Sequence, residues 1–218
     1  MSPIESDGCQ KEKTMSHHDA LAIVSPEEAV ERLKQGNERF VSGKTHHPHT
    51  ARKWLEETCH EGQHPFATVI ACSDSRVPVE EVFDQGVGDI FTIRVAGNVV
   101  HADETGSAEY SAAHLGTPLI VVMGHTKCGA VTAVVHKDKL EGNIHKLVHS
   151  IASVVKRSRA KGFKGDALID DAIRENVQES INGLLKGSTE ILRLVVEGRV
   201  KIVGALYHLE NGRVEFLS

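Results

Sequence analysis

Several features are scarce in this sequence of 218 residues, and each scarcity excludes a class of protein. Aromatic residues make up only 4% of the chain and no basic stretch is interleaved with them, so nothing indicates a nucleic-acid-binding surface. The formal net charge of −5 argues against the same partner. No apolar run reaches the roughly 20 residues that a membrane-spanning helix needs. The four cysteines are too few for a disulfide-stabilised scaffold.

The composition is otherwise that of an ordinary globular protein, with 25% charged and 40% apolar residues. The start of the chain is polar and lacks the apolar stretch of a signal peptide, so we expect residues 1–24 to form a flexible extension. Residues 25–218 show neither an internal repeat nor a low-complexity linker, which predicts a single catalytic domain. We also expect a cytoplasmic protein, because a reducing compartment keeps thiols free.

Hydrophobic periodicity divides the domain into an N-terminal helical arm and an alternation of strands and helices. The arm begins at Ser25-Pro26-Glu27-Glu28, where serine suits the N-cap and proline the first helical turn, and a second helix covers 51–59. After residue 66 the alternation predicts an α/β fold, a mostly parallel β-sheet flanked by helices. The last two strands are expected to meet in a tight turn at Asn211-Gly212. We expect strands at 67–72, 90–95, 118–124, 200–206 and 213–216, a short helix from Pro78, and helices at 105–115, 128–135, 143–160, 166–186 and 188–197.

Two short segments contain the residues best suited to chemistry. Cys72, Asp74 and Arg76 follow the first expected strand, and His125 and Cys128 follow the third. Residues two apart on an extended chain point to the same face, so Cys72 and Asp74 can reach one ion or one water molecule. Ligands bind at the carboxyl ends of parallel strands, and sequential strands are usually close in space. We therefore expect both segments to meet at one edge of the sheet.

Two thiolates and one imidazole suit zinc, with a fourth position that is open to water or closed by Asp74. Cys128 is expected near a helix N-terminus, where the helix dipole favours a thiolate. Taken singly, a cysteine at the end of a buried strand is usually a small core residue, and a lone histidine is more often hydrogen-bonded than metal-bound. The combination at these spacings favours a metal site. Cys59, in a polar helix end, is interpreted as a spare thiol.

The segments 71–78 (ACSDSRVP) and 124–131 (GHTKCGAV) closely resemble the two signature segments of the β-class carbonic anhydrases. The likeness continues at 63–66 (QHPF), 88–98 (GDIFTIRVAGN) and 106–110 (GSAEY), and it covers roughly residues 26–218. The resemblance implies a zinc enzyme with the β-carbonic anhydrase fold. It also implies a homodimer or a dimer of dimers, with active sites at the subunit interface.

Residue by residue, the resemblance implies that Cys72, His125 and Cys128 ligate zinc (Zn2+), one ion per chain. Asp74 and Arg76 would form a catalytic pair, and Asp74 would serve as an alternative fourth ligand in a closed state.

Two further residues would contact the substrate. Gln63 would reach it from across the subunit interface, and the backbone N–H of Gly129 would help to bind bicarbonate. The sequence also departs from the pattern of some family members, which have a second, non-catalytic bicarbonate pocket. That pocket needs Trp three residues before the first zinc cysteine and Gly directly before it. Val69 and Ala71 stand at these places, so we expect the pocket to be absent.

The resemblance therefore implies the reversible hydration of CO2 to bicarbonate and a proton by a zinc-bound hydroxide, which is the activity of a carbonate dehydratase. A hydrolase of carbonyl sulfide or carbon disulfide is the alternative, because relatives with such activities share the zinc site. A non-catalytic zinc module is a third interpretation, against which the intact Asp74–Arg76 pair argues. The expected partners are CO2 or bicarbonate and further copies of the chain, with no nucleic acid and no membrane.

Overall fold

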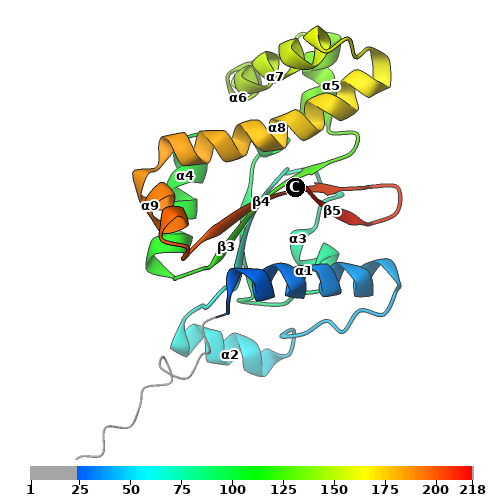
Figure 1. Ribbon diagram of the computed structural model, residues 1–218. Helices are drawn as coiled ribbons and strands as arrows, with labels where there is room; N and C mark the ends of the chain where they lie inside the picture. Colours follow the sequence, from blue (N-terminus) through cyan, green and yellow to red (C-terminus); the bar gives the residue numbers. More distant parts are fainter. Residues whose placement is uncertain (1–23, 218) are drawn as a thin grey trace, which may run out of the picture.

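The computed structural model describes residues 24–217 and shows one sheet with helices on both faces (Figure 1). Within this range the sheet has five strands in the order β2-β1-β3-β4-β5. The first four strands in this order are parallel, and β5 pairs antiparallel with β4. The predicted α/β class with a mostly parallel sheet is therefore confirmed. Residues 1–23 of the expected extension lie outside the described residues.

The helices and strands follow the expected alternation. None of the helices between residues 24 and 217 combines the length and the apolar character that a membrane crossing requires. In chain order, the elements are α1 (Pro26–Val41), α2 (Arg52–Glu61), β1 (Ala67–Ala71), α3 (Val79–Val82), β2 (Ile90–Arg94), η2 (Ala96–Asn98), α4 (Ala102–Glu109), η3 (Tyr110–His114), β3 (Leu119–His125), α5 (Gly129–His136), α6 (Ile144–Leu147), α7 (His149–Ala160), α8 (Gly165–Gly187), α9 (Thr189–Val196), β4 (Lys201–Tyr207) and β5 (Val214–Leu217).

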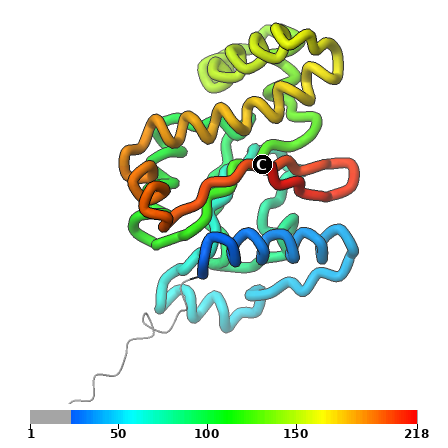
Figure 2. The backbone as a smooth tube through the Cα atoms, viewed as in Figure 1, coloured from blue at the N-terminus to red at the C-terminus, as the bar shows by residue number. Residues whose placement is uncertain are grey.

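Alternate residues of the central strands enter two separate apolar layers. In β1, Val69 belongs to a cluster with Leu33 of α1 and Val82 of α3. The next residue, Ile70, belongs to a cluster on the other face with Leu184 of α8. Figure 2 shows the same arrangement, with α1 on one side of the sheet and α8 and α9 on the other. Every residue of β1 and β3 is buried, as is typical of parallel strands covered on both faces.

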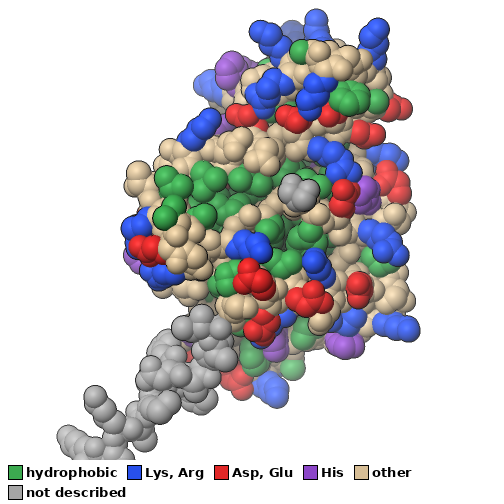
Figure 3. Space-filling view, in the orientation of Figure 1, with side chains coloured by type: hydrophobic (Ala, Val, Ile, Leu, Met, Phe, Trp, Pro, Cys, Tyr) green, Lys and Arg blue, Asp and Glu red, His purple; other side chains and the backbone are tan. Residues whose placement is uncertain are grey.

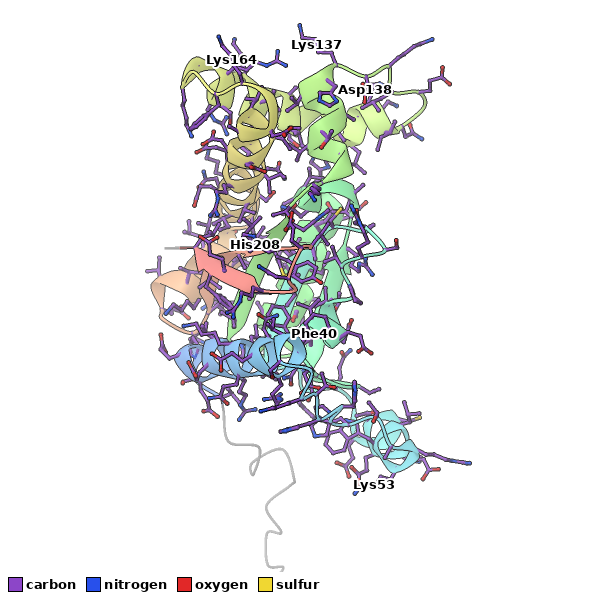
Figure 4. The ribbon with its side chains drawn as sticks, turned by 90° about the vertical axis from the view of Figure 1, so that its right-hand side faces the viewer. Phe40, Lys53, Lys137, Asp138, Lys164 and His208 are labelled. Atoms are coloured by element: carbon purple, nitrogen blue, oxygen red, sulfur yellow. The ribbon has the colours of Figure 1, made fainter. Side chains whose placement is uncertain are left out.

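The two helices of the predicted N-terminal arm differ in their packing. The α1 helix begins as expected, because the Ser25 side chain accepts a hydrogen bond from the Glu28 amide at 3.1 Å. Its Ala29 and Leu33 are fully buried, so α1 is part of the core. None of the residues of α2 is buried, and Figure 4 shows Lys53 on α2 at one end of the molecule. The α2 helix therefore lies at the periphery.

Three local expectations differ from the structure. The helix expected at 143–160 is divided into α6 and α7 at Val148, which is buried in the cluster beneath them. The helix expected at 105–115 begins earlier and changes to π-helical hydrogen bonding at Tyr110. The β4–β5 connection is longer than a two-residue turn, because His208 donates its amide to the Arg213 carbonyl at 2.8 Å and closes a loop around Asn211-Gly212.

The α8 helix lies very close to the sheet because two strand residues opposite it are glycines. A Cβ atom on Gly124 of β3 would lie 2.8 Å from a methyl group of Val177. A Cβ atom on Gly204 of β4 would lie 3.1 Å from the other methyl group of the same side chain. Side chains at these positions would push the helix outward, since real Cβ contacts are rarely so short. The glycines thus determine how deeply α8 is seated.

Candidate metal centre

The strand order creates a crevice at the carboxyl ends of β1 and β3. From β1 the chain continues to β2 at the outer edge and then returns to form β3 on the other side of β1. Ligands bind at such reversal points of parallel sheets. Ala71 is paired with Met123, so Cys72, directly after β1, emerges beside His125 at the end of β3. Cys128 follows as the N-cap of α5.

The structure brings these three side chains into one buried group. The ligand atoms of Cys72, His125 and Cys128 all lie within 4.8 Å of one another, and this is the one group of its kind within residues 24–217. The three residues are 5%, 1% and 1% exposed, respectively. A group of two thiols and one imidazole shielded from solvent is the donor set that zinc prefers.

The imidazole of His125 is prepared for a metal ion. Its Nδ1 lies 2.9 Å from the carbonyl oxygen of Thr126, which requires Nδ1 to carry the proton and to donate it. The other nitrogen, Nε2, then presents its lone pair, and it is buried without a hydrogen-bond partner among the described residues. A buried polar atom without a partner is destabilising by about 1–3 kcal/mol, so the site fits a cation at this atom.

The two thiols are electrostatically linked. The pKa of Cys72 is lowered to about 4 despite its burial, chiefly by the hydrogen bond that Cys128 donates to it. The pKa of Cys128 is raised, first by its hydrogen bond with Cys72 and then by burial. One thiolate therefore forms readily in the metal-free chain, and its negative charge opposes ionisation of the second thiol. A bound cation would remove this opposition, because a coordinating thiol is deprotonated.

Backbone amides point toward both sulfur atoms. The amide of Gly97 donates a hydrogen bond to Cys72 Sγ at 3.2 Å, and the Asp74 amide contributes a second donor that lowers the pKa of Cys72. At Cys128 the amides of Ala130 and Val131, in the first turn of α5, act in the same direction. The expected helix N-terminus at Cys128 is thus present.

Asp74 is held beside the group by Arg76. The guanidinium donates from Nε to Oδ1 at 2.9 Å and from Nη2 to Oδ2 at 2.8 Å, and the Arg76 amide donates to Oδ1 at 3.0 Å. This pairing keeps the pKa of Asp74 well below its usual range. Asp74 Oδ2 lies 3.9 Å from His125 Nε2, and Asp74 does not belong to the three-ligand group.

Two supports of this site were not identified by sequence reasoning. Arg94, at the end of β2, donates to the Cys72 carbonyl at 3.1 Å and to the Asp74 carbonyl at 2.6 Å. Thr126 donates to Glu210 at 3.0 Å and thereby ties the β3–α5 loop to the β4–β5 loop. The first contact follows from the register, since Arg94 is paired with Ala71, but the order of the strands is needed to see it.

The two residues expected to contact substrate lie in different places. Gly129 is exposed at the start of α5, and a Cβ atom there would meet nothing within 4 Å, so space adjoins its backbone beside Cys128. Gln63 precedes β1, whereas Cys72 follows it, so within one chain Gln63 lies at the opposite end of the strand. Val69 and Ala71 are fully buried in β1.

Comparisons with known proteins agree with this geometry. The family model described as carbonic anhydrase matches residues 67–214. Carbonic anhydrase 2 of Mycobacterium tuberculosis is 38% identical over 196 residues, covering 87% of this chain and 91% of the relative. The carbonic anhydrase of Mycolicibacterium smegmatis is 38% identical over 198 residues, covering 89% and 94%.

Solved structures of the same class share the fold. The β-carbonic anhydrase CcaA superposes with a TM-score of 0.68 at 27% identity, covering 87% of this chain and 91% of that one. The β-carbonic anhydrase CafA of Aspergillus fumigatus gives a TM-score of 0.67 at 26% identity, covering 77% and 86%. With its family match, its curated relatives and its fold, this chain belongs to the carbonic anhydrase family, in the β class.

Proposed function

We propose that the chain catalyses the reversible hydration of CO2 to bicarbonate and a proton, as a carbonate dehydratase of the lyase class. The observation that supports this most directly is the buried group of Cys72, His125 and Cys128 beside the Asp74–Arg76 pair. These three residues would hold one zinc ion per chain. Three protein ligands with a further position for water are typical of catalytic rather than structural zinc sites.

Zinc held by these residues would supply a nucleophile near neutral pH, because zinc lowers the pKa of a coordinated water molecule toward ~7. The side chains of the chain supply orientation. Arg76 occupies both carboxylate oxygens of Asp74 and keeps Asp74 ionised, so Asp74 remains a hydrogen-bond acceptor throughout the working pH range. Its Oδ2, 3.9 Å from His125 Nε2, would accept a hydrogen bond from the nucleophile and so direct a lone pair of the nucleophile toward CO2.

The start of α5 would bind the product. Bicarbonate is an anion, and the N-terminus of a helix stabilises an anion through its backbone amides and its dipole. Gly129 has open space beside its backbone and directly follows Cys128. We therefore assign its N–H to bicarbonate, next to the metal ligands.

The active unit would be a homodimer or a dimer of dimers in which Gln63 acts on the neighbouring subunit. Gln63 is exposed and lies at the far end of β1 from its own metal group. An apolar area over the sheet, between α8 and α1, is visible in Figure 3. On α9, Val196 is 79% exposed. Contiguous apolar surface of this kind is typical of protein–protein contacts and supports an assembly.

Subunit mixing tests the role of Gln63. Neither Gln63→Ala, which lacks the substrate contact, nor Cys72→Ala, which lacks a ligand, should be fully active alone. If Gln63 acts across the interface, a mixed dimer contains one complete site, and activity rises when the two variants are unfolded and refolded together. If Gln63 acts within its own chain, mixing restores nothing.

We place the protein in the cytoplasm, with residues 25–218 as one catalytic domain. The free thiols of Cys72 and Cys128 support the location, because a reducing compartment maintains them. The single sheet shared by the layers on both faces supports one domain.

Stopped-flow measurement of CO2 hydration on protein of known zinc content tests the activity. Carbonyl sulfide and carbon disulfide, assayed in parallel, test the alternative. Zinc-loaded protein that hydrates CO2 no faster than buffer would refute the proposed function.

A further inference from the structure

A strained turn after β2 delivers a backbone N–H to one of the sulfur ligands. In η2, two successive residues adopt left-handed backbone angles, Gly97 with φ +74° and Asn98 with φ +42°. The turn is buried, and the Gly97 amide donates to Cys72 Sγ at 3.2 Å. Glycine populates positive and negative φ about equally, so Gly97 alone does not fix the direction of this N–H.

Two polar side chains of α8 donate hydrogen bonds to the carbonyls of this turn. Asn176 Nδ2 donates to the Gly97 carbonyl at 2.7 Å, and Ser180 Oγ donates to the Asn98 carbonyl at 2.8 Å. They are one helical turn apart and therefore share a face of the helix. Both are buried, 1% and 4% exposed, next to apolar residues of α8 such as Val177. A buried amide costs stability unless it is hydrogen-bonded, and Asn176 has its bond on the turn.

These contacts restrict the freedom of the turn at its most flexible residue. Anchoring the carbonyl of Gly97 fixes its ψ angle, and anchoring the next carbonyl fixes the peptide that follows. The Gly97 N–H belongs to the preceding peptide and shares the Gly97 Cα atom, so the anchored carbonyl restricts its rotation away from Cys72 Sγ. The second amide on this sulfur, that of Asp74, comes from the loop that contains Cys72 itself. The Gly97 donor is thus the part of the sulfur environment that depends on α8.

We propose that Asn176 is a positioning residue of the metal centre, which holds the Gly97 N–H against Cys72 Sγ and so limits how much charge this thiolate donates to the metal. The inference rests on the proposed zinc site but not on the reaction that the site catalyses. Loss of an outer partner of a metal ligand typically lowers metal affinity by about 10–100-fold. The hydrogen bond of Asn176 ends on the Gly97 carbonyl, so we infer that it acts through the turn.

The direct test is NMR of the full chain loaded with NMR-active cadmium. If the N–H···Sγ hydrogen bond forms in the loaded protein, the Gly97 amide proton is scalar-coupled to cadmium through the sulfur. We expect this coupling in the wild type and its loss in Asn176→Ala. Absence of the coupling in cadmium-loaded wild type overturns the proposal, and this measurement does not depend on whether any variant folds.

Variants give a second readout. In Asn176→Ala we expect zinc affinity, measured by competition with a chelator, to fall by about 10–100-fold. With cobalt(II) in place of zinc, the sulfur-to-metal charge-transfer band should move to lower energy, because a thiolate without the N–H donor is more electron-rich. Ser180→Ala is the matched control: it loses a buried hydrogen bond to the same turn but leaves the Gly97 carbonyl anchored. It should lower the melting temperature without moving the band.

The outcomes separate this inference from the proposed function. A band and a zinc affinity equal to wild type in folded Asn176→Ala overturn the positioning role. An equal band shift in Ser180→Ala also overturns it, because the effect would then be a general loosening of the turn. A wild type that binds neither zinc nor cobalt refutes the metal centre and this inference together. Metal binding with the coupling present, but without CO2 hydration, refutes only the proposed function.

Discussion

Replacing Arg76 with alanine removes the group that holds Asp74. The carboxylate would lose two side-chain hydrogen bonds, at 2.9 and 2.8 Å, and keep the one from the backbone amide. Hydrogen bonds to charged groups contribute about 1.5–3 kcal/mol each when shielded from solvent. The Arg76 side chain is 54% exposed, and exposed ion pairs contribute far less. Solvent therefore weakens the contacts of Arg76 with Asp74 relative to those of a buried pair.

The freedom that Asp74 would gain determines the expected loss of activity. Asp74 Oδ2 already lies 3.9 Å from His125 Nε2, so a freed carboxylate needs little movement to join the ligand group and displace water. Loss of an outer partner in a metal site typically lowers activity by about 10–100-fold. We expect kcat/KM for CO2 to fall by a factor in this range at neutral pH, with the zinc content unchanged. Arg76→Lys, which keeps the charge but not the two-pronged contact, should lie between Arg76→Ala and wild type.

The assay is stopped-flow CO2 hydration combined with elemental analysis of the same samples. Arg193→Ala is a suitable control, because Arg193 is 47% exposed, pairs with Glu190 and lies on α9 away from the metal ligands. It should keep full activity. A zinc-replete Arg76→Ala variant with wild-type kcat/KM would refute the reasoning. Loss of zinc from Arg76→Ala would also refute it, because Arg76 would then support the metal ligands rather than Asp74.

Three further predictions follow from the site. Cys72→Ala and Cys128→Ala should each lose both zinc and activity. Cys59→Ala, which changes an exposed thiol, should keep both. Full zinc in either ligand variant would contradict the assignment of the ligands. Hydration activity should rise between about pH 6.5 and 9, as expected for a zinc-coordinated water that titrates near or above pH 7. Asp74 cannot cause this rise, because its pKa lies below its ordinary value of about 4 and it is therefore ionised throughout this pH range. A flat kcat/KM profile would contradict the proposed nucleophile. Bicarbonate should not inhibit cooperatively, since Val69 and Ala71 are buried strand residues where the second pocket of some relatives needs Trp and Gly; a sigmoidal loss of rate at constant ionic strength would show the opposite.

Local signals in the sequence were sufficient for much of the fold and for the residues of the metal group. Ser25 and Pro26 mark the start of α1 because capping depends on a few neighbouring residues. The sequence also predicted that Cys72 and His125 lie close together, because parallel strands present their carboxyl ends at a common edge of the sheet. This holds even when another strand lies between them along the chain.

Features that depend on the packing of distant elements were not predictable in the same way. Asn176 lies in a helix rich in alternating charge, so a polar residue there is expected to face solvent, and only the approach of α8 shows that it is buried on η2. The division of the helix at Val148 was missed because the apolar residues around it keep helical spacing. Only the packing of Val148 in the buried cluster shows that the chain bends there. Arg94 was missed because its role requires β2 to be the neighbour of β1.

The outer position of β2 has a consequence for how the chain acquires its metal during folding. The N-terminal segment supplies one soft ligand, Cys72, and the others arrive only when β3 has docked on the far side of β1. No short stretch of the unfolded chain can therefore offer all three donors to an ion. Metal that binds only the native state slows unfolding and leaves the rate of folding unchanged. In a denaturant chevron, added zinc should thus lower the unfolding arm alone.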